Sequence, residues 1–179
     1  MLDYERFEND LVQQMLVVFN NWIEQNHDLY IFSLDCASGM ESIGAIANTT
    51  HYLEEQTDTD SEDYWYYKYC EEEWDLFDTF KTISEDMCNC LDENKGVFAN
   101  PEAPNEYSEM FDKHCNEIIK HCKNALIRFK KSISKNHSDI LLTFNIREYL
   151  DGTDRVEIFQ SVNSESASKE YSEHIEGFA

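Results

Sequence analysis

Two histidines and a glutamate recur with helical spacing in the second half of the chain and could hold a metal ion. His114, Glu117 and His121 stand at i, i+3 and i+7, which places them on one face of a helix. However, positions i and i+7 lie about 10.5 Å apart along a helix axis, too far to share one ion easily. Cys115 and Cys122 follow the apolar side of the same segment, as small buried hydrophobic residues do. We therefore expect no metal and no cofactor here.

Other catalytic signatures are missing from the sequence. Cys88 and Cys90 are separated by one residue, whereas zinc knuckles and redox motifs separate their cysteines by two. The chain has no G-x-S-x-G elbow, and Gly39 and Gly44 stand alone, without a glycine-rich loop to hold phosphates. Among 37 acidic residues, no carboxylate pair can be selected for glycosidase chemistry. We expect a protein that is not an enzyme, and a metal-dependent enzyme built on the two histidines and the glutamate remains the third hypothesis.

An acidic and aromatic stretch, residues 62–78, is the most informative candidate for a binding surface. Tyrosine and tryptophan often anchor protein interfaces, and carboxylates attract the arginines and lysines of a basic partner. The alternative is that Trp65, Tyr67 and Trp74 are buried and that the acids form a solvated face. The residues that we expect to contact a partner are Glu71, Glu72, Glu73, Asp75, Asp78, Trp65, Tyr66 and Tyr69.

The net charge narrows the range of partners. The chain has 179 residues, and 14 Lys and Arg against 37 Asp and Glu give a formal charge of −23 near neutral pH. Residues 54–93 carry more than half of this charge, with 15 acids and two bases. Nucleic acids and anionic membranes attract basic proteins, so the charge argues against both and favours a basic protein partner. The first ten residues lack the features of a signal peptide and the six cysteines are scattered, so we expect a cytoplasmic protein with reduced thiols.

The spacing of apolar residues predicts the elements that position these side chains. Spacings of three and four residues predict helices, and alternation of apolar and polar residues predicts strands. The expected helices are residues 3–26, 50–56, 76–91, 105–135 and 164–177, with a loop at 96–104. The expected strands are residues 30–36, 41–47, 140–146 and 156–162, paired as two hairpins. This order favours a single α+β domain over residues 1–179, in which several helices cover an antiparallel or mixed sheet of about four or more strands.

Several of these segments together resemble a small bacterial domain family of unknown function. The segments that carry the resemblance are YIFSLD, ESIGAIANT, YWYYKYCEEEW, ILLTFNIREY, IFQSVN and ASKEYSEHI. Some members of that family are immunity proteins, encoded beside polymorphic or contact-dependent toxins. The resemblance implies a single cytoplasmic immunity-like domain that binds and neutralises a toxin domain and that has no catalytic residues of its own.

The charge and the resemblance favour the same partner. Many such toxins are basic nucleases, because they must bind phosphate. The leading hypothesis is an immunity protein of a contact-dependent growth inhibition or related polymorphic toxin system. It would bind its cognate toxin domain one to one, and a ribonuclease is favoured over a deoxyribonuclease. The alternative hypothesis is an acidic adaptor that binds a basic protein other than a toxin.

Overall fold

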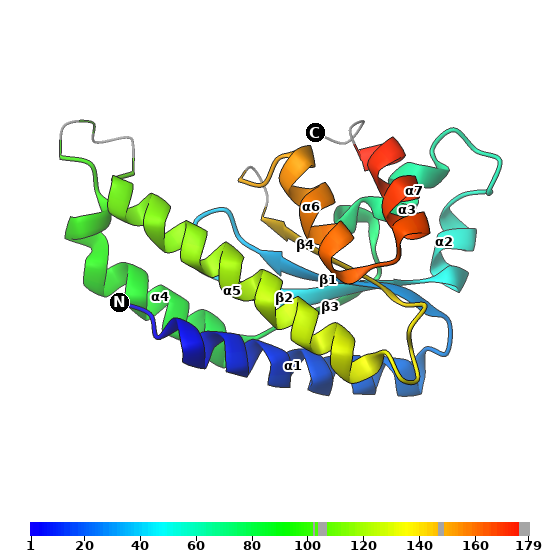
Figure 1. Cartoon of the computed structure of the whole chain (residues 1–179), viewed down its shortest axis with the longest axis horizontal. Coiled ribbons are helices and arrows are strands. Elements are labelled where there is room, and N and C mark those ends of the chain that lie inside the picture. Colours follow the sequence, from blue (N-terminus) through cyan, green and yellow to red (C-terminus); the bar gives the residue numbers. More distant parts are fainter. Residues whose placement is uncertain (102, 104–106, 147–148, 176–179) are drawn as a thin grey trace.

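The structure, a computed structural model, describes residues 1–101, 103, 107–146 and 149–175, and contains both helices and strands (Figure 1). The helices are α1 (Tyr4–Gln25), α2 (Thr50–Gln56), α3 (Tyr64–Tyr69), α4 (Lys81–Phe98), α5 (Glu109–Ile133), α6 (Gly152–Val162) and α7 (Glu165–Ile175), with a short 3₁₀ helix, η1, at Glu71–Glu73. The strands are β1 (Leu29–Cys36), β2 (Ile43–Thr49), β3 (Leu76–Thr79) and β4 (Leu141–Ile146). No described helix is long and apolar enough to cross a membrane.

The described strands form one mixed sheet in the order β3-β2-β1-β4. The predicted hairpin is confirmed, because β1 pairs antiparallel with β2 and places Phe32 opposite Ala47. β3 pairs antiparallel with β2, whereas β4 runs parallel to β1 and places Leu142 opposite Phe32. The expectation of an α+β fold with a mixed sheet is therefore confirmed.

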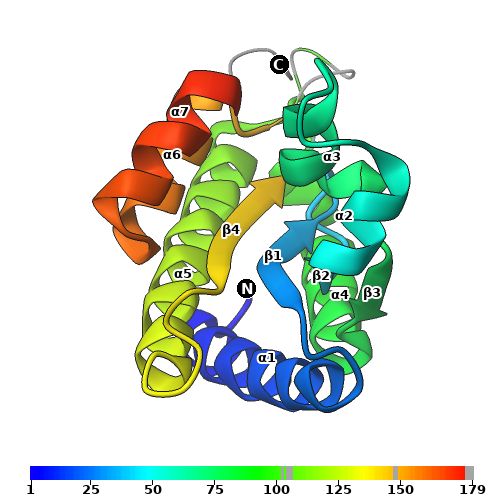
Figure 2. The ribbon, with the colours of Figure 1, turned by 90° about the vertical axis from the view of Figure 1, so that its right-hand side faces the viewer.

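Helices cover both faces of this sheet. Figure 1 shows α1, α4 and α5 on one side and α3, α6 and α7 on the other, and Figure 2 shows β3 at the outer margin of the sheet. The main core fills the first side, where the Phe19 ring lies 6.0 Å from the Phe32 ring and 5.4 Å from the Phe129 ring. Because side chains alternate along a strand, Phe32 and Leu34 enter this core while Ile31 faces the second layer of helices.

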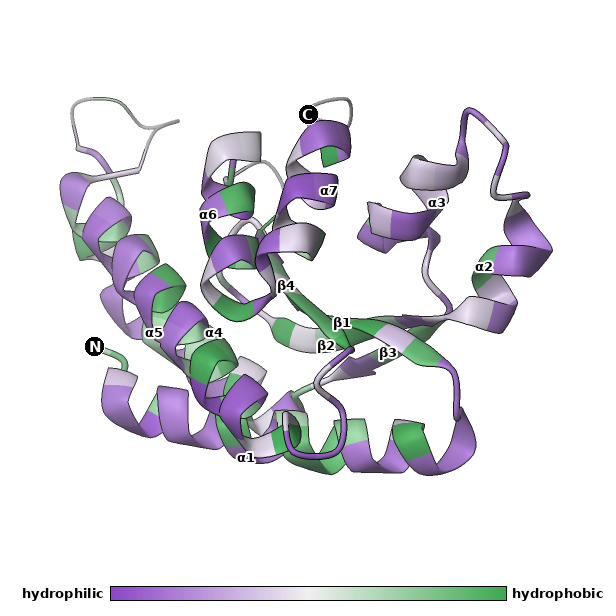
Figure 3. Cartoon of the chain, turned by 45° about the vertical axis from the view of Figure 1, so that its right-hand side comes forward, coloured by the Kyte–Doolittle hydropathy of each residue, from purple (hydrophilic) through white to green (hydrophobic). Residues whose placement is uncertain are grey.

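The second core is smaller and aromatic. Phe159 of α6 stacks on Tyr171 of α7, with their ring centroids 4.0 Å apart, and both rings are buried. The buried members of this second core are Ile31, Ile46, Tyr69, Trp74, Phe159, Tyr171 and Ile175. In Figure 3 the central strands are largely hydrophobic, while hydrophilic residues predominate on the helices around them.

The prediction of a strand at 156–162 is wrong, because these residues belong to helix α6. Its N-cap is Asp151, whose side chain accepts hydrogen bonds from the backbone N–H groups of Thr153 and Asp154. An aspartate in this position satisfies donors that the first helical turn leaves free, and so starts a helix instead of a hairpin turn. As a consequence, β4 has no hairpin partner and pairs with β1.

The region around residue 80 also differs from the prediction. Residues 76–79 form the edge strand β3 and not the first turn of a helix, and α4 runs seven residues beyond the predicted end, from Lys81 to Phe98. The helix therefore takes up the first part of the loop predicted at 96–104, of which residues 102 and 104 lie outside the described residues.

The other predicted helices lie close to their predicted positions, whereas the sequence predicts no helix at α3 or η1. α1 and α2 agree with the predictions to within one residue at each end, and Thr49 caps α2 by accepting a hydrogen bond from the Tyr52 N–H. α5 begins at Glu109, after its cap Ser108, and α7 ends at Ile175. Residues 105, 106, 176 and 177 of the predicted helices lie outside the described residues.

Candidate functional site: the acidic and aromatic segment

The segment at 62–78 consists of three short elements that lead to the edge of the sheet. α3 packs on α7, η1 follows directly, and β3 then pairs with β2. The segment therefore has an inner side, in contact with the second core, and an outer side at the margin of the sheet (Figures 1 and 2).

The aromatic residues of α3 belong mainly to the inner side. The Trp65 ring stacks on His174, with centroids 3.9 Å apart, and the Tyr69 ring meets the edge of Tyr171 at 5.0 Å. The Tyr69 hydroxyl donates to Glu170, which also forms a 2.7 Å ion pair with Lys68. Burial and the hydrogen bond to Glu170 raise the pKa of Tyr69. Tyr69 is thus buried, whereas Trp65 is half-buried and packs against the second core.

Glu71 is buried and holds η1 to α6. Its side chain is 3% exposed and pairs with Arg155, which is 11% exposed. Nη2 of Arg155 donates to both carboxylate oxygens, at 2.9 Å and 2.7 Å. Burial raises the pKa of Glu71, and the guanidinium charge of Arg155 opposes this rise. The residue expected to contact a partner is instead part of the interior.

The sequence does not identify Arg155 as the partner of Glu71, because the predicted strand at 156–162 leaves Arg155 in the connection before it. The half-buried Asp35 and the buried Tyr171 lie close to the pair, since Asp35 raises the pKa of Glu71 and Tyr171 raises the pKa of Arg155. Burial raises the pKa of Tyr171 to about 12, although Arg155 lowers it. Among the described residues, Trp74 Nε1 and the Tyr171 hydroxyl have no well-formed hydrogen bond. This interior is therefore more polar than the main core.

The outer side of the segment is acidic and exposed. Glu72, Asp75 and Asp78 are exposed, and Glu73 is half-buried. The Tyr66 hydroxyl donates a 2.8 Å hydrogen bond to Glu73, which fixes that carboxylate beside an aromatic ring. We call the exposed surface that these side chains form together with Phe77 the acidic rim. The acidic rim consists of Tyr66, Glu72, Glu73, Asp75, Phe77 and Asp78.

Two features make the acidic rim suitable for protein binding. Asp75 and Asp78 form no ion pair with any described Lys, Arg or His, so their charges are open to a partner. Phe77 is 61% exposed, which is unusual for a large apolar side chain in a strand. Exposed carboxylates close to an exposed aromatic side chain combine the polar and apolar groups that occur in typical interfaces. Of the eight predicted contact residues, the structure brings five to this surface and places Glu71, Tyr69 and Trp65 inside or against the second core.

The three residues considered for a metal site have other partners. Nδ1 of His114 lies 2.8 Å from the Tyr4 hydroxyl, while Nδ1 of His121 lies 2.7 Å from Glu8 and its Nε2 is 3.5 Å from Glu117. Burial lowers the pKa of His114. No group of three or more potential metal ligands occurs in the part of the chain that the structure describes. These histidines therefore join α5 to α1.

Glu8 is the centre of this contact between α1 and α5. Arg128 donates to it at 2.8 Å, and Asn124 and His121 also bond to it. Burial raises the pKa of Glu8, but these hydrogen bonds outweigh burial, so the pKa lies below its ordinary value. Part of the positive charge of α5 is thus neutralised by an ion pair with α1.

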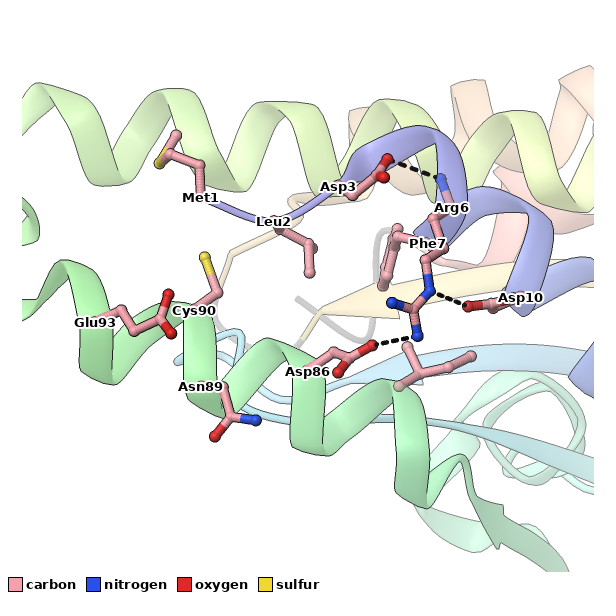
Figure 4. A pocket seen from close by; sticks show the side chains of 11 residues that line it. Met1, Leu2, Asp3, Arg6, Phe7, Asp10, Asp86, Asn89, Cys90 and Glu93 are labelled. Atoms are coloured by element: carbon pink, nitrogen blue, oxygen red, sulfur yellow. Dashed lines mark hydrogen bonds and ion pairs between the residues drawn. The ribbon is translucent and has the colours of Figure 1, made fainter.

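A groove between the start of α1 and α4 is one of several concave features of the described surface and contains charged side chains (Figure 4). Its volume is about 230 Å³, below the roughly 300–1,000 Å³ of typical small-molecule sites. Arg6 points across it and pairs with Asp10 at 3.4 Å and with Asp86 at 3.3 Å (Figure 4). Arg6, Asp10 and Asp86 are thus already paired with one another, and the contact between Arg6 and Asp86 joins α1 to α4.

These observations define a single-domain α+β protein with helices on both faces of a mixed sheet and an acidic rim at one edge. Residues 11–164 match the family described as a domain of unknown function (DUF4303), and the chain belongs to this family. The match includes all four strands and the acidic rim, and it ends before α7. No curated protein and no solved structure matches the chain significantly.

Proposed function

We propose that this protein is a bacterial immunity protein that binds a basic toxin domain one to one and neutralises it. The observation that carries the proposal is the acidic rim, in which Asp75 and Asp78 form no ion pair with a described basic residue and the nearby Phe77 is 61% exposed. The family resemblance of the sequence supports the same role. A nuclease suits this surface best, with a ribonuclease favoured, because groups that bind phosphate are positively charged.

The charge gives such a protein a kinetic advantage. An immunity protein must bind before the toxin reaches its substrate, and opposite charges raise the rate of encounter. Protection also requires a tight complex, with a Kd near nanomolar, which corresponds to about −12 kcal/mol. The carboxylates of the rim would steer the toxin, and the exposed Phe77 would supply apolar contact area.

The first experiment identifies the partner. The tagged protein is captured from its native bacterium at about 0.15 M salt, where contacts between distant exposed charges are screened. We expect a basic C-terminal fragment of a large secreted protein at a one-to-one ratio, and addition of the purified protein should abolish its nuclease activity. A stoichiometric basic partner that is not a toxin would identify an adaptor. Recovery of abundant basic proteins that leave with salt would contradict the proposal.

Charge reversal then tests whether the rim makes the contact. The triple variant Glu72→Lys, Asp75→Lys and Asp78→Lys should lower the association rate by about tenfold to a hundredfold. The matched control reverses three exposed acids elsewhere, at Glu24, Asp92 and Glu157, and changes the net charge by the same amount. An equal loss in both triple variants would show that the overall charge acts and not the rim.

A further inference from the structure

The two edges of the sheet end differently. At the β4 edge, Asn163 accepts a 2.9 Å hydrogen bond from the Leu142 N–H and donates a 2.7 Å hydrogen bond to the Leu142 carbonyl. The side-chain amide thus occupies the main-chain groups that another strand would need, and α6 packs against the same strand. The β4 edge is closed at this point.

The β3 edge is open. The Phe80 N–H donates to the Ile43 carbonyl of β2 at 3.0 Å. Because main-chain groups alternate in direction along a strand, those of Asp78 and Leu76 also point toward β2. The N–H and C=O groups of Phe77 and Thr79 consequently point away from β2. No other described strand pairs with β3, and Figure 2 shows β3 at the margin of the ribbon.

The side chains of β3 block its edge only against some partners. Natural edge strands are often protected by proline, by short length or by charged side chains, and β3 is four residues long with one charge, Asp78, and neither lysine nor proline. Instead, the strand exposes Phe77 on one face of the sheet and Asp78 on the other. The edge therefore offers main-chain hydrogen bonds, an apolar contact and negative charge at the same place.

We infer that β3 docks an extended, basic segment of a partner protein, which adds to the sheet as a fifth strand. Such strand addition obtains affinity from main-chain hydrogen bonds and specificity from alternate side chains. Charge selects the occupant, because lysines or arginines of the added strand would meet Asp75 and Asp78. A second copy of this chain would bring its own aspartates to the same edge and a formal charge of −23, and would be repelled. The identity of the partner as a toxin rests on the proposed function, whereas the mode of docking does not.

A synthetic peptide tests the docking mode without the natural partner. The probe is a peptide of about eight residues with alternating lysine and valine, the length of an ordinary strand, and its control replaces lysine by glutamate. Amide exchange of the full chain is followed by NMR. With the lysine peptide, exchange at Phe77 and Thr79 should slow by about tenfold or more, while exchange at Leu76 and Asp78, which face β2, stays unchanged. Unchanged exchange at Phe77 and Thr79, or equal slowing by the glutamate peptide, would overturn the inference.

Two variants separate strand addition from simple attraction of charges. Thr79→Pro removes an N–H that points outward and leaves the hydrogen bonds to β2 in place. Phe77→Glu keeps the backbone and replaces the apolar contact with a negative charge, which a purely electrostatic contact would favour. Each variant should weaken peptide binding by about tenfold or more, with an unchanged melting temperature. If Thr79→Pro does not fold, the test rests on peptide binding by Phe77→Glu. Unchanged or tighter binding of the peptide by this variant overturns the inference.

The outcomes for docking and for immunity are distinguishable. Protection of Phe77 and Thr79 by the peptide, with no toxin recovered from the bacterium, would retain strand addition and remove the immunity role. A captured toxin that leaves exchange at these two amides unchanged would retain the immunity role and remove strand addition.

Discussion

Replacing Glu71 by alanine should destabilise the fold strongly, although this residue stands in a run of three exposed-looking glutamates. Its carboxylate is 3% exposed and accepts two hydrogen bonds from Arg155, at 2.9 Å and 2.7 Å. Truncation would leave the Arg155 guanidinium buried without its counter-charge, which typically costs about 3–5 kcal/mol. That is a large share of the roughly 5–15 kcal/mol that stabilises an ordinary domain.

The assay is equilibrium unfolding in urea, followed by tryptophan fluorescence. Glu72→Ala is the matched control, because Glu72 is the exposed neighbour and its loss should change the free energy of unfolding by no more than about 0.5 kcal/mol. The double variant Glu71→Leu with Arg155→Met removes both buried charges and should be less destabilised than Glu71→Ala alone. A cost below about 1 kcal/mol for Glu71→Ala, with an unchanged m-value, would refute a structural role for the pair.

Three further predictions concern packing and pH. Gly44→Ala should lower the free energy of unfolding in urea by about 1–3 kcal/mol, because the added Cβ would lie 2.4 Å from the backbone oxygen of Asp78. An unchanged free energy of unfolding would mean that β2 and β3 can move apart at this point. Phe19→Ala should cost about 3–5 kcal/mol, since its fully buried ring packs between Phe32 and Phe129; a cost near that of an exposed residue would contradict the core described above. Stability should fall as the pH decreases below about 6.5, because burial lowers the pKa of His114 in the folded protein and the unfolded chain then binds the additional proton, at up to about 1.4 kcal/mol per pH unit. His114→Gln should make this decline shallower, and an identical pH profile would show that other groups cause it.

The elements with sustained periodicity could be predicted from the sequence. α1 and α5 each keep one apolar stripe over several turns, and the β1–β2 hairpin alternates around a clear turn signal. β3 was missed for a physical reason. Leu76 and Phe80 both face the main core, one from the strand and one from the residue before α4, so their spacing of four imitates a helical turn. A strand that leads directly into a helix can keep the same buried face, and the periodicity then does not show the boundary.

The helix α6 was mistaken for a strand because Val156 and Ile158 alternate with polar residues. The buried residues Ile158, Phe159 and Val162 instead follow helical spacing, and the signal that could have revealed it was the capping Asp151.

The burial of individual acids could not be predicted from the segment itself. Glu71, Glu72 and Glu73 are consecutive, yet a 3₁₀ turn directs successive side chains about 120° apart, so the first enters the interior and the second faces solvent. The partner that makes burial of Glu71 possible, Arg155, is 84 residues away in the sequence. Composition could therefore indicate an acidic surface, but only the tertiary structure selects which carboxylates belong to it.

The Asn163 side chain hinders the addition of a further strand at the β4 edge of the sheet. Since it occupies the main-chain groups of Leu142, a strand added at β4 would have to displace this amide, whereas no such side-chain cap is found on β3 among the described residues. Fibrils grow by repeated pairing at both ends of a stack, so a sheet with a single available edge terminates after one addition. The amide of Asn163 therefore disfavours growth at both edges of the sheet at once, so that strand addition at β3 would end with a single added strand.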